Sequence, residues 1–207
     1  GPNGAGKSSI FHSILGIVKP TFGKIFVDGV EVTNIPTHKR TSMCGISWCP
    51  QYGGAFADLS VFENLMAIAE LHIKDKEKRL SKINSLIRRF ELENVVKLPS
   101  RILSGGQQRK LILAMALIKD TKILILDEPY SALDPVSVKM IQQLIVSLQM
   151  FERISIVISD HNFRDLLSTV DYSMVLSEGK IVAKGSPNEL VKDSQAIAKY
   201  FGEGFQY

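Results

Sequence analysis

Two different spacings of apolar residues alternate along the chain and predict an α/β domain. Continuous or alternating apolar runs, typical of strands, occupy residues 45–49, 122–126 and 154–159. The helical period occupies residues 6–17, 59–90 as two or three helices, 104–118 and 135–150. Hairpins are expected around Asp28-Gly29 and Glu178-Gly179. Two short helices should follow, the second ending near Phe201.

Composition indicates a globular protein without a strong charge bias. The chain has 207 residues, 45% of them hydrophobic, which is enough for a sizeable core. Its formal net charge of +4 does not by itself indicate a nucleic-acid partner. The basic stretch 74–89 also carries a helical apolar period, so we interpret its charges as the solvated face of a helix.

No segment has the length of a membrane span. The longest apolar run, 111–118, is far shorter than the roughly 20 residues that cross a bilayer, so any membrane role should be peripheral. Cys44 and Cys49 imply neither a disulfide framework nor a zinc site, and we interpret them as reduced thiols of a cytosolic protein. The sequence starts at Gly1 inside a phosphate-loop pattern that normally follows a strand, so we expect an N-terminal truncation.

The first motif predicts a phosphate-binding loop. Glycines allow successive N–H groups to point at phosphate oxygens, and the following helix adds its positive end. Lys7 is expected to reach the β- and γ-phosphates and Ser8 to bind Mg²⁺. The pattern G-x-x-x-x-G-K-[ST] and the next residue comprise Gly1, Pro2, Asn3, Gly4, Ala5, Gly6, Lys7, Ser8 and Ser9.

A second motif places two carboxylates at the end of a buried strand. Residues 123–126 are all apolar and Asp127 and Glu128 follow directly. Ligands of parallel sheets bind at that end of the strands. Asp127 is expected to hold Mg²⁺, and Glu128 to act as the general base toward an attacking water.

A third motif, Leu-Ser-Gly-Gly-Gln, begins a helix. Ser104 and Gln107 have the spacing of a capping box. Capping does not explain Gly105 and Gly106, and we interpret their missing side chains as space for a phosphate to approach the helix N-terminus.

Taken in order, these motifs resemble the nucleotide-binding subunit of ATP-binding-cassette (ABC) transporters. The set also includes Gln51 after a strand, Ser131-Ala132-Leu133-Asp134, and His161 after a strand. The resemblance implies a P-loop NTPase fold with a mixed, mainly parallel sheet, an antiparallel β subdomain and an α-helical signature subdomain. Residues 1–50 and 119–207 would form the catalytic core with the β subdomain, and 51–118 the helical subdomain, within one domain.

The resemblance also implies a mechanism. Two copies would close head to tail around two ATP molecules, each ATP contacting the phosphate loop of one copy and the signature Ser104–Gln107 of the other. Gln51 would sense Mg²⁺ and the attacking water, Asp134 would act across the dimer, and His161 would contact the γ-phosphate. Each of these three residues also has an ordinary structural interpretation: a loop glutamine, an N-cap aspartate and a histidine at a strand end. Any one of them alone would not indicate this mechanism.

Finer features resemble the ATPase of bacterial lipopolysaccharide export. They include Leu59-Ser60-Val61, the segments 63–67 and 160–164, and the ending 200–205, whereas Gln107 and the segment 130–134 depart from that pattern. This resemblance implies a homodimer beneath two transmembrane permeases, at the cytoplasmic face of the inner membrane, with no nucleic-acid partner. The alternatives are the ATPase of a branched-chain amino-acid importer and, in another class, the soluble cassette ATPase of iron–sulfur assembly.

By the same resemblance, a transmembrane partner would bind beside residues 51–59 and the helix through Leu71. Phe56, Phe62 and Phe90 are then either anchors for that partner or core residues, and aromatics at helical spacing are more often core.

Overall fold

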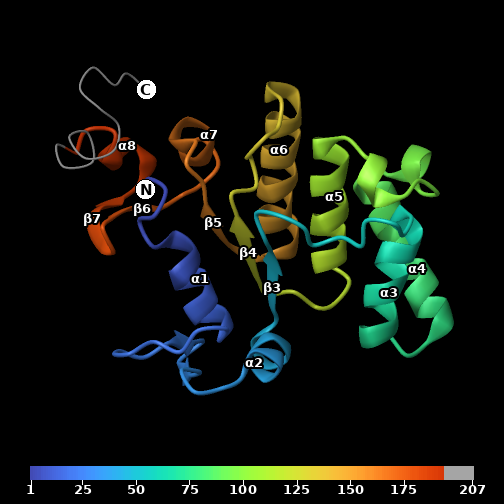
Figure 1. Cartoon of the computed structure of the whole chain (residues 1–207), viewed down its shortest axis with the longest axis horizontal. Coiled ribbons are helices and arrows are strands. Elements are labelled where there is room, and N and C mark those ends of the chain that lie inside the picture. The colour runs from blue at the N-terminus through green and yellow to red at the C-terminus, as the bar shows by residue number, and fades with distance from the viewer. Residues whose placement is uncertain (194–207) are drawn as a thin grey trace. The chain divides into compact units, whose positions relative to one another are not determined.

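The computed structural model describes residues 1–193 and contains two compact units (Figure 1). The central unit is residues 41–157, and the split unit combines residues 1–40 with the chain from 158 onward. Helix α2 (Thr37–Cys44) and strand β5 (Ser155–Ser159) each contribute residues to both units. The expected ending at 200–205 and the last helix near Phe201 lie outside the described residues.

A parallel strand pair forms the centre of the central unit. Strand β3 (Ile46–Cys49) pairs with β4 (Ile123–Asp127), with Ile46 opposite Ile123 and Cys49 opposite Leu126. The strand order is β3-β4-β5. Leu124, Ile125 and Leu126 are fully buried, as a strand covered on both faces requires.

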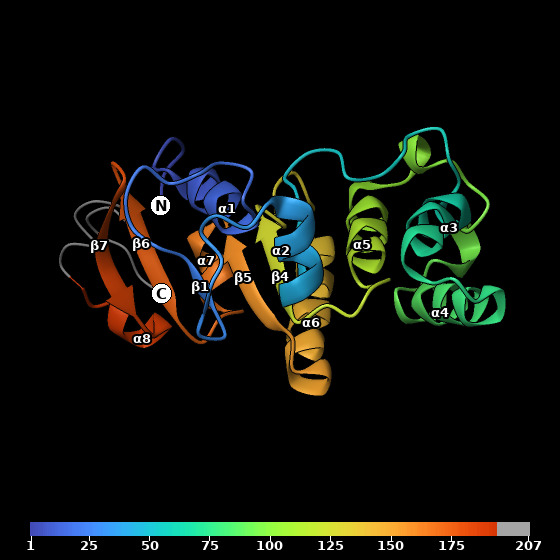
Figure 2. The same cartoon turned by 90° about the horizontal axis from the view of Figure 1, so that it is seen from below.

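Helices cover this pair and extend the unit away from it. Helix α5 (Gly105–Ala116) contacts β3, α6 (Pro135–Glu152) and α3 (Val61–His72), and α3 packs against α4 (Lys76–Arg89). Figure 2 shows α5 between the strands and the α3–α4 pair. Short 3₁₀ turns occur at Glu93–Val95 and Ser100–Ile102. Phe90, one of the candidate partner anchors, is fully buried and is a core residue, whereas Phe56 is exposed.

Side chains define where these helices begin. Ser60 with Glu63, and Ser104 with Gln107, form capping boxes at the starts of α3 and α5. Asp75 caps α4, and Asp134 caps α6, whose first residue is Pro135.

The split unit contains the phosphate-loop helix and two hairpins. Helix α1 spans Lys7–Leu15, and the first hairpin pairs β1 (Phe26–Val27) with β2 (Val30–Glu31). The second pairs β6 (Ser173–Ser177) with β7 (Lys180–Gly185). Both two-residue turns have positive φ at both positions, with Asp28 at 50° and Gly29 at 77° in the first, which fits the twist of antiparallel strands. Short helices α7 (Phe163–Leu167) and α8 (Pro187–Leu190) complete the described part.

A buried arginine joins the end of α1 to the segment after the first hairpin. Arg40 is 1% exposed, and its guanidinium donates to the carbonyls of Ser13, Ile14, Thr33 and Ile35 at 2.6 to 3.2 Å. The carbonyls of Ser13 and Ile14 are at the C-terminal end of α1, where a cation interacts favourably with the helix dipole, and those of Thr33 and Ile35 lie in the segment before α2. Gly16 lies against this guanidinium, because a Cβ at that position would be 2.9 Å from Arg40 Cζ.

The structure confirms the predicted α/β elements and adds two helices. Helices α2 and α7 were not predicted: α2 is polar and has no apolar period, and its only buried residue is Arg40. Among residues 1–193, no helix combines the length and the apolar composition that crossing a membrane requires.

Candidate functional site

The phosphate-loop residues form a turn that leads directly into α1. Gly6 is the N-cap with φ of 102°, a conformation that disfavours any side chain, and Lys7 is the first helical residue. A Cβ on Gly1 would lie 2.1 Å from the carbonyl oxygen of Leu176, so this turn packs directly on β6. The N–H of Gly179 donates to the carbonyl of Ala5 at 3.1 Å, which fixes the turn against the second hairpin.

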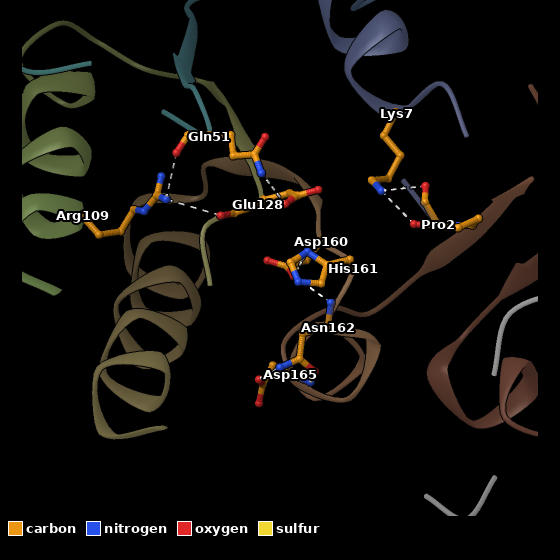
Figure 3. Close-up of polar contacts among 10 residues, drawn as sticks. Pro2, Lys7, Gln51, Arg109, Glu128, Asp160, His161, Asn162 and Asp165 are labelled. Carbon is orange, nitrogen blue, oxygen red and sulfur yellow. Dashed lines mark hydrogen bonds and ion pairs between the residues drawn. The ribbon is translucent and has the colours of Figure 1, made fainter. Parts of the chain in front are cut away.

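Lys7 lies across this turn. Its Nζ donates to the carbonyls of Gly1 at 2.8 Å and Pro2 at 3.1 Å (Figure 3). The ammonium group is therefore held against the first two residues of the loop, and Lys7 itself begins α1. A cation and helix N–H groups together attract phosphate oxygens.

In the central unit, Gln51 and Glu128 are in direct contact. Nε2 of Gln51 donates to Oε2 of Glu128 at 2.6 Å (Figure 3). Glu128 follows β4 with φ of 47°, and both it and Asp127 are buried. The contact orients one oxygen of the carboxylate, and a general base needs such a fixed orientation toward its proton donor.

Arg109 is a residue of this site that the sequence reasoning missed. It is 7% exposed, and its guanidinium donates to the carbonyls of Pro50 at 3.1 Å, Gln51 at 3.4 Å and Glu128 at 3.4 Å (Figure 3). One side chain of the signature helix thus joins the backbones on either side of the Gln51–Glu128 contact. The sequence signal for Arg109 is a positively charged residue within the apolar period of a helix, because a buried cation requires hydrogen-bond acceptors or an opposite charge.

Arg109 also acts on the thiol of Cys49. Burial raises the pKa of Cys49 to about 12, and the nearby positive charge of Arg109 opposes part of this rise. A thiol with this pKa stays protonated at neutral pH and is a poor nucleophile.

The signature residues and Asp134 cap neighbouring helices. Ser104 and Gln107 exchange both bonds of a capping box, at 3.3 and 3.0 Å, as their spacing predicts. Asp134 accepts from the N–H groups of Val136 and Ser137 and from the Ser137 hydroxyl. The Ser137 hydroxyl and N–H lower the pKa of this carboxyl most, so Asp134 is ionised at neutral pH.

His161 belongs to the split unit and follows β5. Its side chain is half exposed, and its Nδ1 lies 3.7 Å from Oδ1 of Asp160, which is too long for a hydrogen bond (Figure 3). The same Asp160 oxygen accepts from the N–H of Asn162 at 2.8 Å. Asp160, which is 1% exposed, thus fixes the backbone that carries His161.

The expected site residues therefore fall into two sets. The split unit contains residues 1–9 and His161, and the central unit contains Gln51, the signature, Asp127, Glu128 and Asp134. The expected Mg²⁺ ligands, Ser8, Gln51 and Asp127, supply hard oxygen donors, which suit this ion together with phosphate and water. Among residues 1–193, no three His, Cys, Asp or Glu side chains cluster as a metal site of their own.

Comparison with known proteins identifies the family. The ABC transporter family pattern matches residues 1–131. The lipopolysaccharide export system ATP-binding protein LptB of Haemophilus influenzae is 36% identical over 208 residues, which cover 100% of this chain and 85% of that protein. LptB of Escherichia coli K12 gives the same identity and coverage. An uncharacterised ABC transporter ATP-binding protein of Rhizobium meliloti is 36% identical over 99% of this chain and 75% of that protein.

Solved structures agree on the fold. CbiO1 of Clostridium perfringens, part of the ABC transporter complex CbiONQ, is 29% identical with a TM-score of 0.83, over 96% of this chain and 80% of that one. The ATP-binding cassette MJ0796, solved as a dimer bound to ADP and Pi, has a TM-score of 0.79 at 23% identity, over 90% of this chain and 82% of its own. The motifs, the fold and these matches lead to one conclusion: the chain belongs to the ABC transporter family and is one of its ATP-hydrolysing, nucleotide-binding subunits.

Proposed function

We propose that this chain is the ATPase of a lipopolysaccharide export system. The observation that carries this assignment is the 36% identity to LptB from two genera, over the whole of this chain and 85% of each relative. The chain would act at the cytoplasmic face of the inner membrane, and its contact with the membrane would run through its permease partners.

We assign nucleotide binding to the phosphate loop and its helix. Residues 1–9 would surround the phosphates of ATP, with Lys7 contacting the β- and γ-phosphates. Ser8 and Asp127 would hold Mg²⁺, and Gln51 would contact both this ion and the attacking water. The ion would neutralise charge that develops on the transferred phosphoryl group.

Glu128 would act as the general base of hydrolysis. As the water oxygen bonds to the γ-phosphorus, the bond from that phosphorus to the β–γ bridging oxygen breaks, and Glu128 accepts the proton of the water. Gln51 would keep the carboxylate oriented for this step, as their 2.6 Å contact indicates. His161 would contact the γ-phosphate, and the products are ADP and phosphate.

Two copies of the chain would close head to tail around two ATP molecules. Residues Ser104–Gln107 of one copy would contact the ATP in the phosphate loop of the other, and Asp134 would act across the dimer. The exposed start of α5 supports this role, because the capping box occupies the N–H groups of Ser104 and Gln107 and the positive end of the helix dipole still faces solvent. The dimeric, ADP- and Pi-bound state of MJ0796 gives a precedent within the fold.

The helical part, residues 51–118, would receive the permease, while residues 1–50 and 119–207 would form the catalytic core. The central unit contains an open cavity of about 250 Å³, lined by residues from both of these parts, that supports a docking place for the permease. Its lining includes Trp48 of β3, Ile68 and His72 of α3, Ile112 of α5, and Pro50 and Lys119 from the loops that follow β3 and α5. The cavity thus lies next to the Gln51 segment, so an inserted partner helix could move Gln51.

The assignment is tested with the chain purified together with the two permeases of a lipopolysaccharide export system. The complex is placed in proteoliposomes that contain lipopolysaccharide, and ATP-dependent release of lipopolysaccharide is measured. We expect release with wild type and none with Glu128→Gln, which should still assemble. A chain that hydrolyses ATP but neither binds these permeases nor drives release would belong to a different transporter.

A further inference from the structure

The two signature glycines have different surroundings in the structure. Gly105 is exposed and Gly106 is buried. A Cβ on Gly106 would lie 2.7 Å from Oγ and 3.2 Å from Cβ of Ser137, in the first turn of α6. Within the described chain, and apart from the helix of Gly106 itself, these are the heavy atoms that such a Cβ would meet within 4 Å. The side chain of Ser137, in the same chain, therefore covers Gly106.

The Ser137 hydroxyl is fixed in this position by Asp134. Oγ donates to Oδ2 of Asp134 at 2.5 Å, while Oδ1 accepts from the N–H groups of Val136 and Ser137, both at 3.0 Å. Rotation of Ser137 away from Gly106 would break the hydroxyl bond. An added methyl group on Gly106 would therefore either clash with Ser137 or remove one partner of Asp134.

Gly105 offers a contrast within the same motif. A Cβ there would be 3.1 Å from Cδ2 of Leu133, which is the end of a flexible side chain. Its exposed face remains open to a ligand, and the intrachain contact requires a shift of only a few tenths of an ångström. The reason for glycine at position 105 is thus not the reason for glycine at position 106.

We propose that Gly106 lacks a side chain because Ser137 of the same chain occupies that space, and that Ser137 is a positioning residue that joins the signature to Asp134. This inference rests on the proposed roles of the signature and of Asp134 at the nucleotide. In this arrangement Ser137 sets the position of both elements together. A phosphate that approaches the start of α5 does so over Gly105.

The test combines substitutions at positions 106 and 137 in the full chain bound to its permeases. Gly106→Ala is measured alone and together with Ser137→Ala or Ser137→Gly, and each Ser137 variant is also measured alone. Gly105→Ala with and without Ser137→Gly is the matched control. The readouts are kcat and KM for ATP, and the melting temperature in the absence of nucleotide.

We expect Gly106→Ala to lower kcat by roughly 10-fold or more and to lower the melting temperature, since the added Cβ would lie closer than normal to both Oγ and Cβ of Ser137. Adding Ser137→Ala to Gly106→Ala should restore part of both losses, because the Cβ of residue 137 remains. Adding Ser137→Gly instead should bring kcat to within about 3-fold of that of Ser137→Gly alone. Ser137→Gly should not restore the kcat or the melting temperature of Gly105→Ala. A folded double variant as inactive as Gly106→Ala would overturn the proposal.

These outcomes separate this proposal from the site assignment. If wild-type ATPase activity does not depend on Glu128, the proposed site is wrong whatever Ser137 does. The melting temperatures still report on the contact in that case. If Gly106→Ala lowered the melting temperature equally in the wild-type chain and in the Ser137→Gly variant, Ser137 would not occupy the space next to position 106.

Discussion

Nε2 of Gln51 donates a 2.6 Å hydrogen bond to Oε2 of Glu128, and strand register explains why these two residues meet. Strands β3 and β4 are parallel with Cys49 opposite Leu126. Gln51 and Glu128 each lie two residues farther along. The carboxyl ends of paired parallel strands therefore deliver an amide and a carboxylate to the same place.

Removal of the Gln51 amide should slow the chemical step. We expect Gln51→Ala to lower kcat by roughly 10-fold, because the carboxylate loses an oriented partner, with a small change in KM. Gln51→Glu is the matched variant of equal size. It should lower kcat further at neutral pH, since two carboxylates repel one another at this distance. Steady-state ATPase kinetics check both, and unchanged kcat in Gln51→Ala would remove Gln51 from the mechanism.

Arg109 should matter for both stability and turnover. Arg109→Met leaves the carbonyls of Pro50, Gln51 and Glu128 without their buried donor, so we expect a loss of roughly 2–4 kcal/mol in the free energy of unfolding. Arg109→Lys keeps the charge but lacks the planar guanidinium that reaches several carbonyls. It should therefore retain only part of the stability that Arg109→Met loses. The free energy of unfolding, measured with denaturant, and kcat should both fall in each of these variants. A normal kcat in folded Arg109→Met would limit this residue to stability.

Arg40 should be essential for the stability of the phosphate-loop helix. Its guanidinium is fully buried and donates to four carbonyls, so Arg40→Met should cost roughly 3–5 kcal/mol in the free energy of unfolding. Lys39→Met changes the adjacent, exposed cation and should stay within about 0.5 kcal/mol of wild type. Equal unfolding midpoints for the two variants would contradict this account.

The start of α3 should show a pH-dependent stability. Hydrogen bonds from the side chain and backbone of Ser60 lower the pKa of Glu63, so this carboxylate stabilises the fold above its ordinary pKa, and the contribution is lost as pH falls through the lowered value. Ser60→Ala should therefore lower the melting temperature at pH 7, and the difference from wild type should shrink below about pH 4. It should not vanish, because the N–H of Glu63 still donates to Ser60 Oγ in wild type.

Glu63→Gln is the control for that titration. It keeps the capping geometry without an ionisable group, so the effect of Ser60→Ala measured in the Glu63→Gln background should be nearly independent of pH in this range. A Ser60→Ala difference that is constant from pH 7 to pH 3 would show that the Glu63 charge contributes nothing.

Sequence patterns were sufficient for most of the fold because local signals and tertiary packing agree. Asp28-Gly29 forms the expected two-residue turn, and Ser104 with Gln107 forms the expected capping box. Helix α2 could not be predicted, because it contains no apolar period and packs through Arg40, whose carbonyl partners lie up to 27 residues away in the sequence. Contacts of that kind depend on the folded chain.

The candidate site was predictable in its residue types and less so in its contacts. The motifs named Gln51 and Glu128 but contained no sign that the two touch. The sequence pattern places Arg109 within a helix of apolar period. It favours an interpretation of the missing side chain of Gly106 as space for a phosphate. The structure gives Arg109 three carbonyl partners and places Ser137 next to Gly106, and both contacts join segments that are distant in the sequence.

The most direct test of the central assignment is the effect of Glu128→Gln on ATP hydrolysis by the chain bound to its permeases. The substitution keeps the size of the side chain and its contact with Gln51 but removes the base. We predict a loss of roughly 10²-fold or more in kcat, with ATP still bound and trapped in a dimer of two chains. An undiminished kcat would show that Glu128 is not the general base, and the catalytic role of the β4 end would have to be abandoned.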